Sequence, residues 1–481
     1  MNPYNFDICY TANHGFSARM LLQTNLLTQL ADKGLQLAVI VPDKDDPSLK
    51  PLQAHDSITL FDGASDLGFW QRQWKTFRKY ALQDITANPA LYEKYYYDIS
   101  KDKPLAVKLR ARLGMLITNL IGKSVKRRNY FRNKEKKWLR SNKLGSLLND
   151  INPKVLVATY PMMSPEDQLL LAAHNQGRQR IIHLLSWDNI TSKGVFPALA
   201  DRYIVWGPIM KNELVEHYGV NEDNIRAFGV PHFDFHVEVR HREHTRELLK
   251  EYFGLDPDRP FAMMTLSAPR FAPREIDIAR RLADEVDKGR FGDLQLLVRP
   301  HPQNVSGRYK DDEWLDILAY IDSLSSCYVN YPRMTEGATL PWSTRREDMI
   351  RLSVALKHCA IAINSGSTTA VEALIFDRPV IFTSFDADED RPYWYSSRRM
   401  MDYTHLKKLT SKGGIDITYS EEKFYDKIDE ALAHPDAKQS LRKSTLMDQL
   451  INDNGTATKD IVDFLHEYVT DKEFEQVATS K

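Results

Sequence analysis

The sequence predicts an α/β protein made of two successive doubly wound domains, each built around its own parallel sheet. Short apolar runs of strand length alternate with segments of helical periodicity along most of the chain, and this alternation is typical of parallel sheets. The chain is also long, with 481 residues, whereas one ordinary domain holds roughly 150–250. More than one domain is therefore expected, and the order of the elements favours two.

The first domain is expected over residues 1–231. It opens with a strand at Phe6–Thr11, a helix at about Ser17–Lys33 and a second strand at Gln36–Val41. The stretch 67–143 is polar, helical and irregular in pattern, and we expect it to be a helical insertion. Further strands are predicted at Val155–Thr159, Arg180–Ser186 and Arg202–Trp206.

A boundary is expected near Gly229–His232, and a second alternating series follows over 232–455. A charged helix is predicted at Arg242–Tyr252, and an amphipathic C-terminal helix within 456–481 can cross back to the first domain. The predicted strands of the second domain are Phe261–Leu266, Leu294–Arg299, Cys327–Tyr331, Ala360–Ile363 and Val380–Phe382. Ligands of open parallel sheets bind beyond the carboxyl ends of the strands, so polar clusters after strands are candidate sites.

The segment Ala360–Phe382 is the most informative part of the chain, because it reads as strand, polar loop, helix and strand. The first N–H groups of a helix lack partners and carry partial positive charge, and small residues let a phosphate approach them. Glu372, one turn into the helix, is placed to accept hydrogen bonds from a ribose. Plain helix capping would use the same residue types and stays an alternative. The loop residues are Asn364, Ser365, Gly366, Ser367, Thr368 and Thr369.

Two further clusters follow strands of the second domain. In the sequence Arg299-Pro-His301-Pro, the guanidinium fork suits a phosphate and the imidazole can donate a hydrogen bond beside it. Ser267 and Arg270 follow the first strand of this domain and could reach the same phosphates. The structural alternative is a surface turn with a salt-bridged Arg for the Arg299 cluster, and a helix cap with a solvated Arg for the Ser267 cluster.

The first domain offers an acceptor side. His14 follows the first strand and is a candidate general base for an acceptor hydroxyl, and Asp188 is the competing base. Asp188 belongs to a loop, Ser186–Gly194, that combines an aromatic ring with many hydrogen-bonding groups and could hold a sugar or a base. The remaining acceptor-binding candidates in that loop are Trp187, Asn189, Thr191 and Lys193.

Residues 101–143 hold 15 Lys and Arg, opposed only by Asp102 and Glu135 and interleaved with apolar and aromatic side chains. A basic helix of this kind suits an anionic membrane surface. Nucleic acid is a second partner of the right charge. No nucleic-acid-binding motif accompanies the segment, however, and we do not expect the protein to bind nucleic acid. A solvated helical hairpin is the third interpretation.

Composition limits the remaining classes. The net charge is zero, so no global excess of charge points to nucleic acid or a membrane. Cys9, Cys327 and Cys359 form no CxxC pair, and neither a disulfide framework nor a zinc site is expected. The N-terminus lacks the pattern of a signal peptide, and no apolar run reaches the ~20 residues of a bilayer span. We expect a cytoplasmic protein that can associate with the inner face of the plasma membrane.

These motifs together resemble bacterial glycosyltransferases of the GT-B fold that act in surface-polysaccharide biosynthesis. The segment Asn364–Pro379 is similar to their donor loop and following helix, in which a Glu at the position of Glu372 binds the ribose. The Arg299-Pro-His301-Pro sequence is similar to loops of CDP-glycerol glycerophosphotransferases and of GT-B sialyl- and Kdo-transferases. The resemblance covers about residues 150–385 with motifs and the rest by architecture.

The resemblance implies two Rossmann-like domains, with a nucleotide-sugar donor held mainly by the second and a glycan or lipid-linked acceptor by the first. It implies metal-independent transfer without a cofactor. The Glu pair of many retaining GT-B enzymes is missing, as is the additional acidic set of UDP-GlcNAc 2-epimerases, which share the fold. The alternative functions are a CDP-glycerol- or ribitol-type polyol phosphotransferase and a nucleotide-binding module without catalysis.

Overall fold

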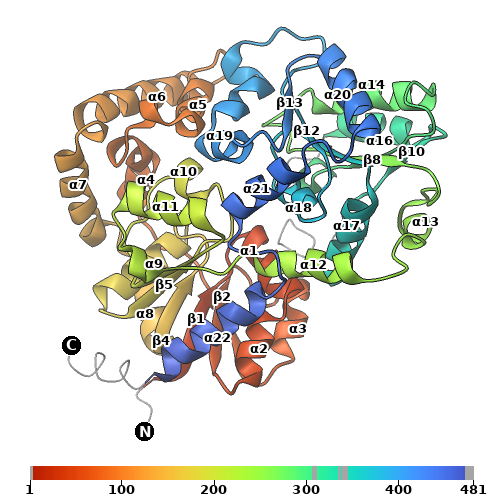
Figure 1. The fold of residues 1–481 in the computed structure, drawn as a ribbon. Helices are drawn as coiled ribbons and strands as arrows, with labels where there is room; N and C mark the ends of the chain where they lie inside the picture. Colours follow the sequence, from red (N-terminus) through yellow and green to blue (C-terminus); the bar gives the residue numbers. More distant parts are fainter. Residues whose placement is uncertain (1–3, 306–310, 334–336, 338–344, 472–481) are drawn as a thin grey trace. The chain divides into compact units, whose positions relative to one another are not determined.

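The computed structural model describes residues 4–305, 311–333, 337 and 345–471. They form two compact units (Figure 1), one with the described residues of 1–231 and 456–471 and the other with those of 232–333 and 345–455. Each unit is built on one parallel sheet covered by helices. The predicted fold class is confirmed.

The sheet of the first unit has seven parallel strands in the order β3-β2-β1-β4-β5-β6-β7. Two of these strands were not predicted from the sequence. β3 is half exposed and β7 has three residues, so neither has the continuous apolar run of a buried strand. The strands are β1 (Phe6–Thr11), β2 (Leu37–Val41), β3 (Ile58–Asp62), β4 (Pro153–Ala158), β5 (Gln179–His183), β6 (Arg202–Val205) and β7 (Ile225–Ala227).

The single helix predicted after β1 is wrong: the chain forms α1 (Gly15–Gln23) and α2 (Leu26–Asp32) instead. Thr24 Oγ1 donates to the carbonyl of Met20 at 2.8 Å, and Thr28 Oγ1 donates to the carbonyl of Asn25 at 3.1 Å. Such side-chain bonds compete with the helix ladder, which explains the break between the two helices.

Other helices of the first unit flank its sheet, and the last of them comes from the far end of the chain. The apolar face of α22 (Ala457–Thr470) belongs to the same core as α2. Lys33 pairs with Asp463 at 3.1 Å, and Tyr468 donates to Gln179 Oε1 at 2.9 Å. The flanking helices include α8 (Asn142–Ile151), α9 (Glu166–Asn175), α10 (Asn189–Ser192) and α11 (Pro208–Tyr218).

The stretch between β3 and α8 is helical and forms its own small core around Tyr80, Ile85 and Leu91. A Cβ added to Gly114 would lie 2.5 Å from the ring of Tyr80, so two helices approach each other closely there. We call this part, residues 69–138, the helical insertion. Its helices are α4 (Phe69–Ala81), α5 (Pro89–Asp98), α6 (Leu105–Ile117), the π-helical η3 (Thr118–Gly122) and α7 (Val125–Trp138).

The second unit has a six-stranded parallel sheet in the order β10-β9-β8-β11-β12-β13. Its edge strand β13 was not predicted, because three residues with polar ends give no apolar run. The charged helix predicted at Arg242–Tyr252 is shorter, α13 (Leu248–Phe253). The strands are β8 (Phe261–Thr265), β9 (Gln295–Arg299), β10 (Cys327–Val329), β11 (Ile361–Asn364), β12 (Val380–Thr383) and β13 (Asp416–Thr418).

The helices of the second unit alternate with these strands, as doubly wound sheets require. They include α12 (Asp234–His241), α14 (Glu275–Asp287), α15 (Pro302–Val305), α16 (Asp312–Asp322), α17 (Arg346–His358), α18 (Thr369–Ile375), α19 (Thr404–Thr410), α20 (Glu421–Ala433) and α21 (Gln439–Gln449).

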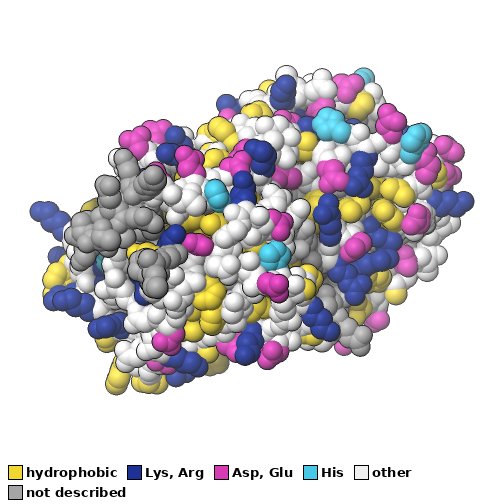
Figure 2. All heavy atoms as spheres, turned by 90° about the horizontal axis from the view of Figure 1, so that it is seen from below, with side chains coloured by type: hydrophobic (Ala, Val, Ile, Leu, Met, Phe, Trp, Pro, Cys, Tyr) yellow, Lys and Arg dark blue, Asp and Glu magenta, His cyan; other side chains and the backbone are white. Residues whose placement is uncertain are grey.

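Charged side chains of both signs are interspersed over the face drawn in Figure 2, in keeping with the net charge of zero. None of the helices in the described ranges combines the length and the apolar character that a bilayer crossing needs.

Candidate functional site

The candidate donor site lies where three neighbouring strands of the second unit end. Strand β8 pairs with β9 and β11, so their carboxyl ends share one edge of the sheet. The hydroxyls of Ser267, after β8, and Ser365, after β11, are 2.9 Å apart. Asn304, in α15 after β9, donates from Nδ2 to the carbonyl of Ser267 at 3.1 Å. The three polar loops are thus joined by direct hydrogen bonds.

Two fully buried amides at this edge keep one polar atom without a partner among the described residues. They are Oδ1 of Asn304 and Nδ2 of Asn364. The other atom of the Asn364 amide is used, because Oδ1 accepts from the N–H groups of Gly366 at 2.9 Å and Ser367 at 2.8 Å. Since buried polar groups are nearly always hydrogen-bonded, unused ones at strand ends suit a polar ligand.

The loop Ser365–Thr369 is held in a turn with one special position. Gly366 has a φ of +104°, and a Cβ there would lie 3.0 Å from Leu406 Cδ1. Glycine alone adopts this conformation without strain. Ser365 is buried, whereas Gly366, Ser367, Thr368 and Thr369 are all partly exposed.

Glu275 is a group of this site that sequence reasoning missed. It is the first residue of α14 and is buried, and it accepts a hydrogen bond from the N–H of Ser267 at 2.6 Å. Burial raises the pKa of Glu275 to about 7, and hydrogen bonds from Ser267 and Ser365 oppose that shift. An acidic residue in the first helical turn after a strand is the available sequence signal, but many helices carry one.

The raised pKa of Glu275 predicts a stability that depends on pH. The unfolded chain ionises this group near 4.5 and the folded chain near 7. Its contribution is therefore complete below pH 4.5 and is lost as the pH rises through 7, by roughly 3 kcal/mol. In Glu275→Gln this loss should vanish, so its urea midpoint should fall less than that of the wild type between pH 5 and 8.

The matched control is Glu313→Gln, which removes an exposed acidic residue from the first turn of α16 in the same unit. This variant should keep the pH dependence of the wild type. Equal pH dependence in Glu275→Gln and wild type would contradict a raised pKa for buried Glu275.

Glu372, predicted to bind a ribose, is buried and engaged within the second unit. His236 Nε2 lies 3.1 Å from Glu372 Oε2, and His236 Nδ1 lies 2.7 Å from Ser353 Oγ. All three side chains are buried. A ribose contact by Glu372 would have to use the carboxylate oxygen that does not face His236.

Arg299 is likewise engaged, through a guanidinium that pairs with buried Asp348 at 2.8 Å and also bonds Asn330. His301 is partly exposed, and its Nδ1 accepts from the N–H of Gln303 at 3.1 Å. Arg270 is exposed. The structure thus joins the loops of Ser267, Ser365 and His301, while Arg299 holds the end of β9 through an ion pair.

In the first unit, His14 and Asp188 come from different strands and lie in one electrostatic neighbourhood. His14 follows β1 and stacks on the ring of Tyr160, with 4.7 Å between the ring centroids. Burial and the charge of Lys193 lower the pKa of His14, and Asp188 opposes that shift. His14 is therefore neutral at pH 7, which is the form that can accept a proton.

Asp188 is held by its own loop. Its carboxylate accepts from Ser186 Oγ at 2.6 Å and from Ser192 Oγ at 2.8 Å, and it pairs with Lys193 at 3.0 Å. These three bonds hold the carboxylate within its own loop and use most of its acceptor sites.

The other acceptor-binding candidates of this loop are buried. Trp187, Asn189 and Thr191 are each at most 5% exposed, so they shape the loop from within. Both amide atoms of Asn189 and the hydroxyl of Thr191 are without hydrogen-bond partners in the part of the chain that the structure describes. Lys193 is the partly exposed member of the set.

Glu166 plays the part in the first unit that Glu275 plays in the second. It is the first residue of α9, and its buried carboxylate accepts from the N–H groups of Thr159 at 2.8 Å and Tyr160 at 2.7 Å, as well as from the hydroxyl of Thr11. Burial raises the pKa of Glu166. Each unit thus ties two neighbouring strand ends together through one buried glutamate.

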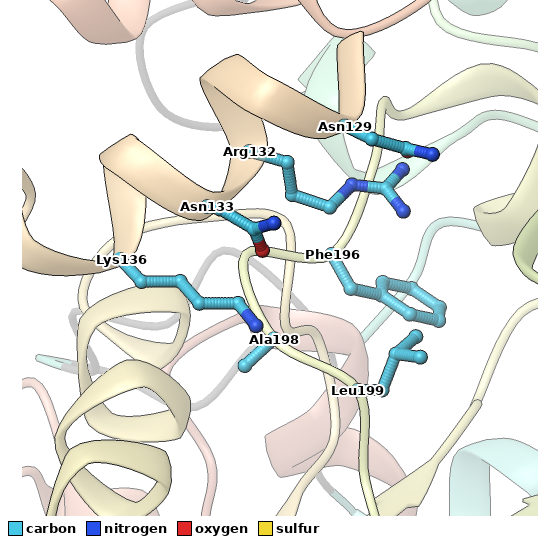
Figure 3. Close-up of a pocket in the computed structure, with 7 residues that line it drawn as sticks. All are labelled: Asn129, Arg132, Asn133, Lys136, Phe196, Ala198 and Leu199. Carbon is cyan, nitrogen blue, oxygen red and sulfur yellow. The ribbon is translucent and has the colours of Figure 1, made fainter. Parts of the chain in front are cut away.

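A pocket of about 260 Å³ lies in the first unit between α7 and the chain that follows the Ser186–Gly194 loop. Figure 3 shows Arg132 and Lys136 extending from α7 toward the segment that carries Phe196 and Leu199. Basic groups thus stand over an apolar wall, an arrangement suited to an anionic group attached to an apolar body. The remaining lining residues are Asn129, Asn133 and Ala198.

Neither a family model nor a curated protein matches the sequence, but solved structures match nearly the whole chain. A glycosyltransferase from Rickettsia africae has a TM-score of 0.50 at 12% identity and covers 98% of this chain and 100% of its own. A putative UDP-N-acetylglucosamine 2-epimerase from Listeria monocytogenes has a TM-score of 0.54 at 12% identity, with 96% of each chain covered.

A UDP-GlcNAc 2-epimerase from Methanocaldococcus jannaschii, solved with UDP-GlcNAc and UDP, has a TM-score of 0.51 at 12% identity and covers 95% of this chain and 99% of its own. At 12% identity, these structural similarities show a common fold and nothing more specific. With its parallel sheets of seven and six strands, the chain has the two-domain GT-B fold.

Proposed function

We propose that this protein is a bacterial glycosyltransferase that moves a sugar from a nucleotide-sugar donor to a glycan or lipid-linked acceptor in surface-polysaccharide assembly. The observation that carries the proposal is the hydrogen-bonded junction of Ser267, Ser365 and Asn304 at the ends of three neighbouring strands. Similar structures include a glycosyltransferase and an epimerase with bound UDP-GlcNAc, which supports a nucleotide sugar as the substrate.

In this proposal the second unit binds the donor. The partly exposed loop Gly366–Thr369 and His301 contact the diphosphate, Arg270 adds positive charge, and Glu372 takes the ribose. Donors fixed in the protein stabilise the charge that develops on the leaving nucleotide, so the transfer proceeds without a metal. Ser267, Ser365 and Glu275 hold the loops in the conformation that presents these groups.

The first unit binds the acceptor in this proposal. Neutral His14 takes the proton of the attacking hydroxyl, so that the oxygen forms a bond to the anomeric carbon as the bond to the nucleotide phosphate breaks. Lys193 and the Ser186–Gly194 loop position the acceptor, and Asp188 holds Lys193 in place.

The test is a donor screen with UDP-, GDP-, CMP- and CDP-linked compounds, each with and without a membrane or glycan extract as acceptor. Transfer of the sugar, with release of the nucleotide, supports the proposal. Release of glycerol phosphate or ribitol phosphate would identify a polyol phosphotransferase. Nucleotide binding without turnover would indicate a binding module, and inversion of UDP-GlcNAc at C2 without acceptor would indicate an epimerase.

The donor side predicts the effect of two substitutions on the Kd of the nucleotide. His301→Ala and Ser367→Ala should each raise it roughly 10- to 150-fold, the value of one lost hydrogen bond to a charged group. Isothermal titration calorimetry with the nucleotide found in the screen measures both. The control is His358→Ala, which removes a partly exposed histidine of the same unit that pairs with Thr245; an equal effect there would contradict the assignment.

A further inference from the structure

The helical insertion carries a stripe of leucines, each of which is more than half exposed in the described chain. Successive spacings of four, four, three and four residues keep the five leucines on one face of α6 and its π-helical continuation η3. Their exposed fractions lie between 51% and 69%, whereas an isolated exposed leucine needs no explanation. The residues are Leu105, Leu109, Leu113, Leu116 and Leu120, and we call them the leucine stripe.

The opposite face of the same helices is already used. Gly114 lies against the ring of Tyr80, and Thr118 Oγ1 donates to the carbonyl of Tyr80 at 3.0 Å. Ala111, Gly114 and Thr118 are buried on this face. The helix therefore cannot turn its leucine stripe inward without breaking its packing on α4.

The exposed charge around the leucine stripe is predominantly positive. Exposed basic side chains occur on α6 and α7 and in the short segments that flank α6 and η3, and of the two acidic residues in 101–143, Glu135 is buried against Arg78. Asp102 is the one acidic group that remains exposed in this segment. The exposed basic residues closest in sequence to the stripe are Lys101, Arg110, Arg112, Lys123, Lys126 and Arg127.

We propose that the leucine stripe inserts into an anionic membrane surface, with the surrounding Lys and Arg side chains bound to lipid phosphates. An apolar face flanked by cations is the pattern of a helix that lies in the membrane interface. Nucleic acid would bind the basic side chains but would leave the five leucines exposed to water. A solvated hairpin would leave them exposed as well. A membrane uses both features.

The helical insertion also holds the proposed acceptor loop. Asn88 Nδ2 donates to the carbonyl of Thr191 at 2.6 Å, and Lys94 Nζ donates to the carbonyl of Ser192 at 2.8 Å. Docking of the leucine stripe therefore brings the Ser186–Gly194 loop to the membrane, and the acceptor is an amphipathic molecule carried by the lipid. Only this last step rests on the proposed function, because vesicle binding is measured without turnover.

The test is sedimentation of the full chain with phosphatidylcholine vesicles, with and without about 30% phosphatidylglycerol. We expect binding to the anionic vesicles that weakens with salt, and a loss of about tenfold or more in the variant L109Q/L113Q/L116Q. The control V215Q/L441Q removes two exposed apolar residues from α11 and α21 and should bind like the wild type. The charge variant K101Q/R110Q/R112Q should lose its preference for anionic vesicles.

Three outcomes would overturn the proposal. Unchanged vesicle binding in L109Q/L113Q/L116Q, with native circular dichroism, would mean that the stripe does not insert. A dimer in the wild type that becomes a monomer in the same variant, measured by light scattering, would assign the stripe to a second copy of this chain. Tight binding of single-stranded RNA that resists the leucine substitutions would assign the surface to nucleic acid.

Discussion

Replacement of His14 by Ala is expected to lower kcat of the proposed transfer reaction roughly 10²- to 10⁴-fold, the usual contribution of a general base. The side chain is partly buried at the end of β1 and stacked on Tyr160, so its orientation is fixed. Burial and Lys193 lower its pKa, so the neutral form predominates at pH 7. Steady-state kinetics with the donor found in the screen measures the loss.

His174→Ala is the matched control, because His174 is also partly exposed, lies in the same unit, and has a pKa lowered by burial. It should keep kcat close to that of the wild type. Asp188→Asn should cost less than His14→Ala, because Asp188 is occupied by Ser186, Ser192 and Lys193. If His14→Ala keeps the kcat of the wild type, or if Asp188→Asn lowers kcat more than His14→Ala does, then His14 is not the general base.

The same assignment fixes how kcat/KM depends on pH. Activity that needs neutral His14 falls as the pH drops through its pKa, which lies below 6.5. Lys193 lowers this pKa, so Lys193→Gln should move the acid limb of the profile to higher pH. Asp188 raises it, so Asp188→Asn should move the limb to lower pH. Shifts in the same direction in both variants would contradict a base that sits between these two charges.

The sequence was sufficient for the fold because buried parallel strands are continuous apolar runs. Strands such as β1, β4 and β8 are buried over most or all of their length and carry such runs, so their positions follow from hydrophobicity alone. The missed strands β3, β7 and β13 lie at sheet edges, where one side faces water and the apolar signal fades. The break between α1 and α2 depends on side-chain bonds that periodicity does not register.

The candidate site was less predictable, because its chemistry depends on pairings between distant residues. Arg299 reads as a phosphate ligand until Asp348 is seen beside it, and Glu372 reads as a ribose ligand until His236 is seen. No motif marks Glu275 in the sequence, because its hydrogen-bond partners Ser267 and Ser365 lie close to it only in the folded chain. The ends of the strands thus locate the site in the sequence. Whether a side chain there is ion-paired, hydrogen-bonded or shifted in pKa can be known only once its spatial neighbours are known.

Replacement of Arg78 by Met is expected to lower the free energy of unfolding by about 3–5 kcal/mol, the cost of breaking a buried ion pair from one side. Arg78 Nε lies 2.7 Å and 2.8 Å from the two carboxylate oxygens of Glu135, which is fully buried. Trp74 Nε1 donates to the same carboxylate at 2.8 Å. Without Arg78 this carboxylate keeps its burial and loses its compensating charge. Urea denaturation followed by circular dichroism measures the change.

Two further variants separate the ion pair from general damage to the helical insertion. Lys459→Met breaks an exposed pair with Asp463 in the same unit and should leave the free energy of unfolding close to that of the wild type, because exposed ion pairs contribute little. The double variant R78M/E135L removes both charges and should recover most of the lost stability, because no buried charge remains uncompensated. If the double variant is as unstable as Arg78→Met, the loss comes from packing rather than from charge.

The ion pair also connects stability to the proposed function. Arg78 donates to the carbonyl of Val195 at 2.6 Å, directly after the Ser186–Gly194 loop, while Glu135 fixes α7 on α4. R78M/E135L would restore the fold without restoring the bond to Val195. The double variant should therefore be stable and yet bind the acceptor more weakly, with KM for the acceptor raised and Kd for the nucleotide unchanged. A KM equal to that of the wild type would show that the helical insertion does not position the acceptor loop.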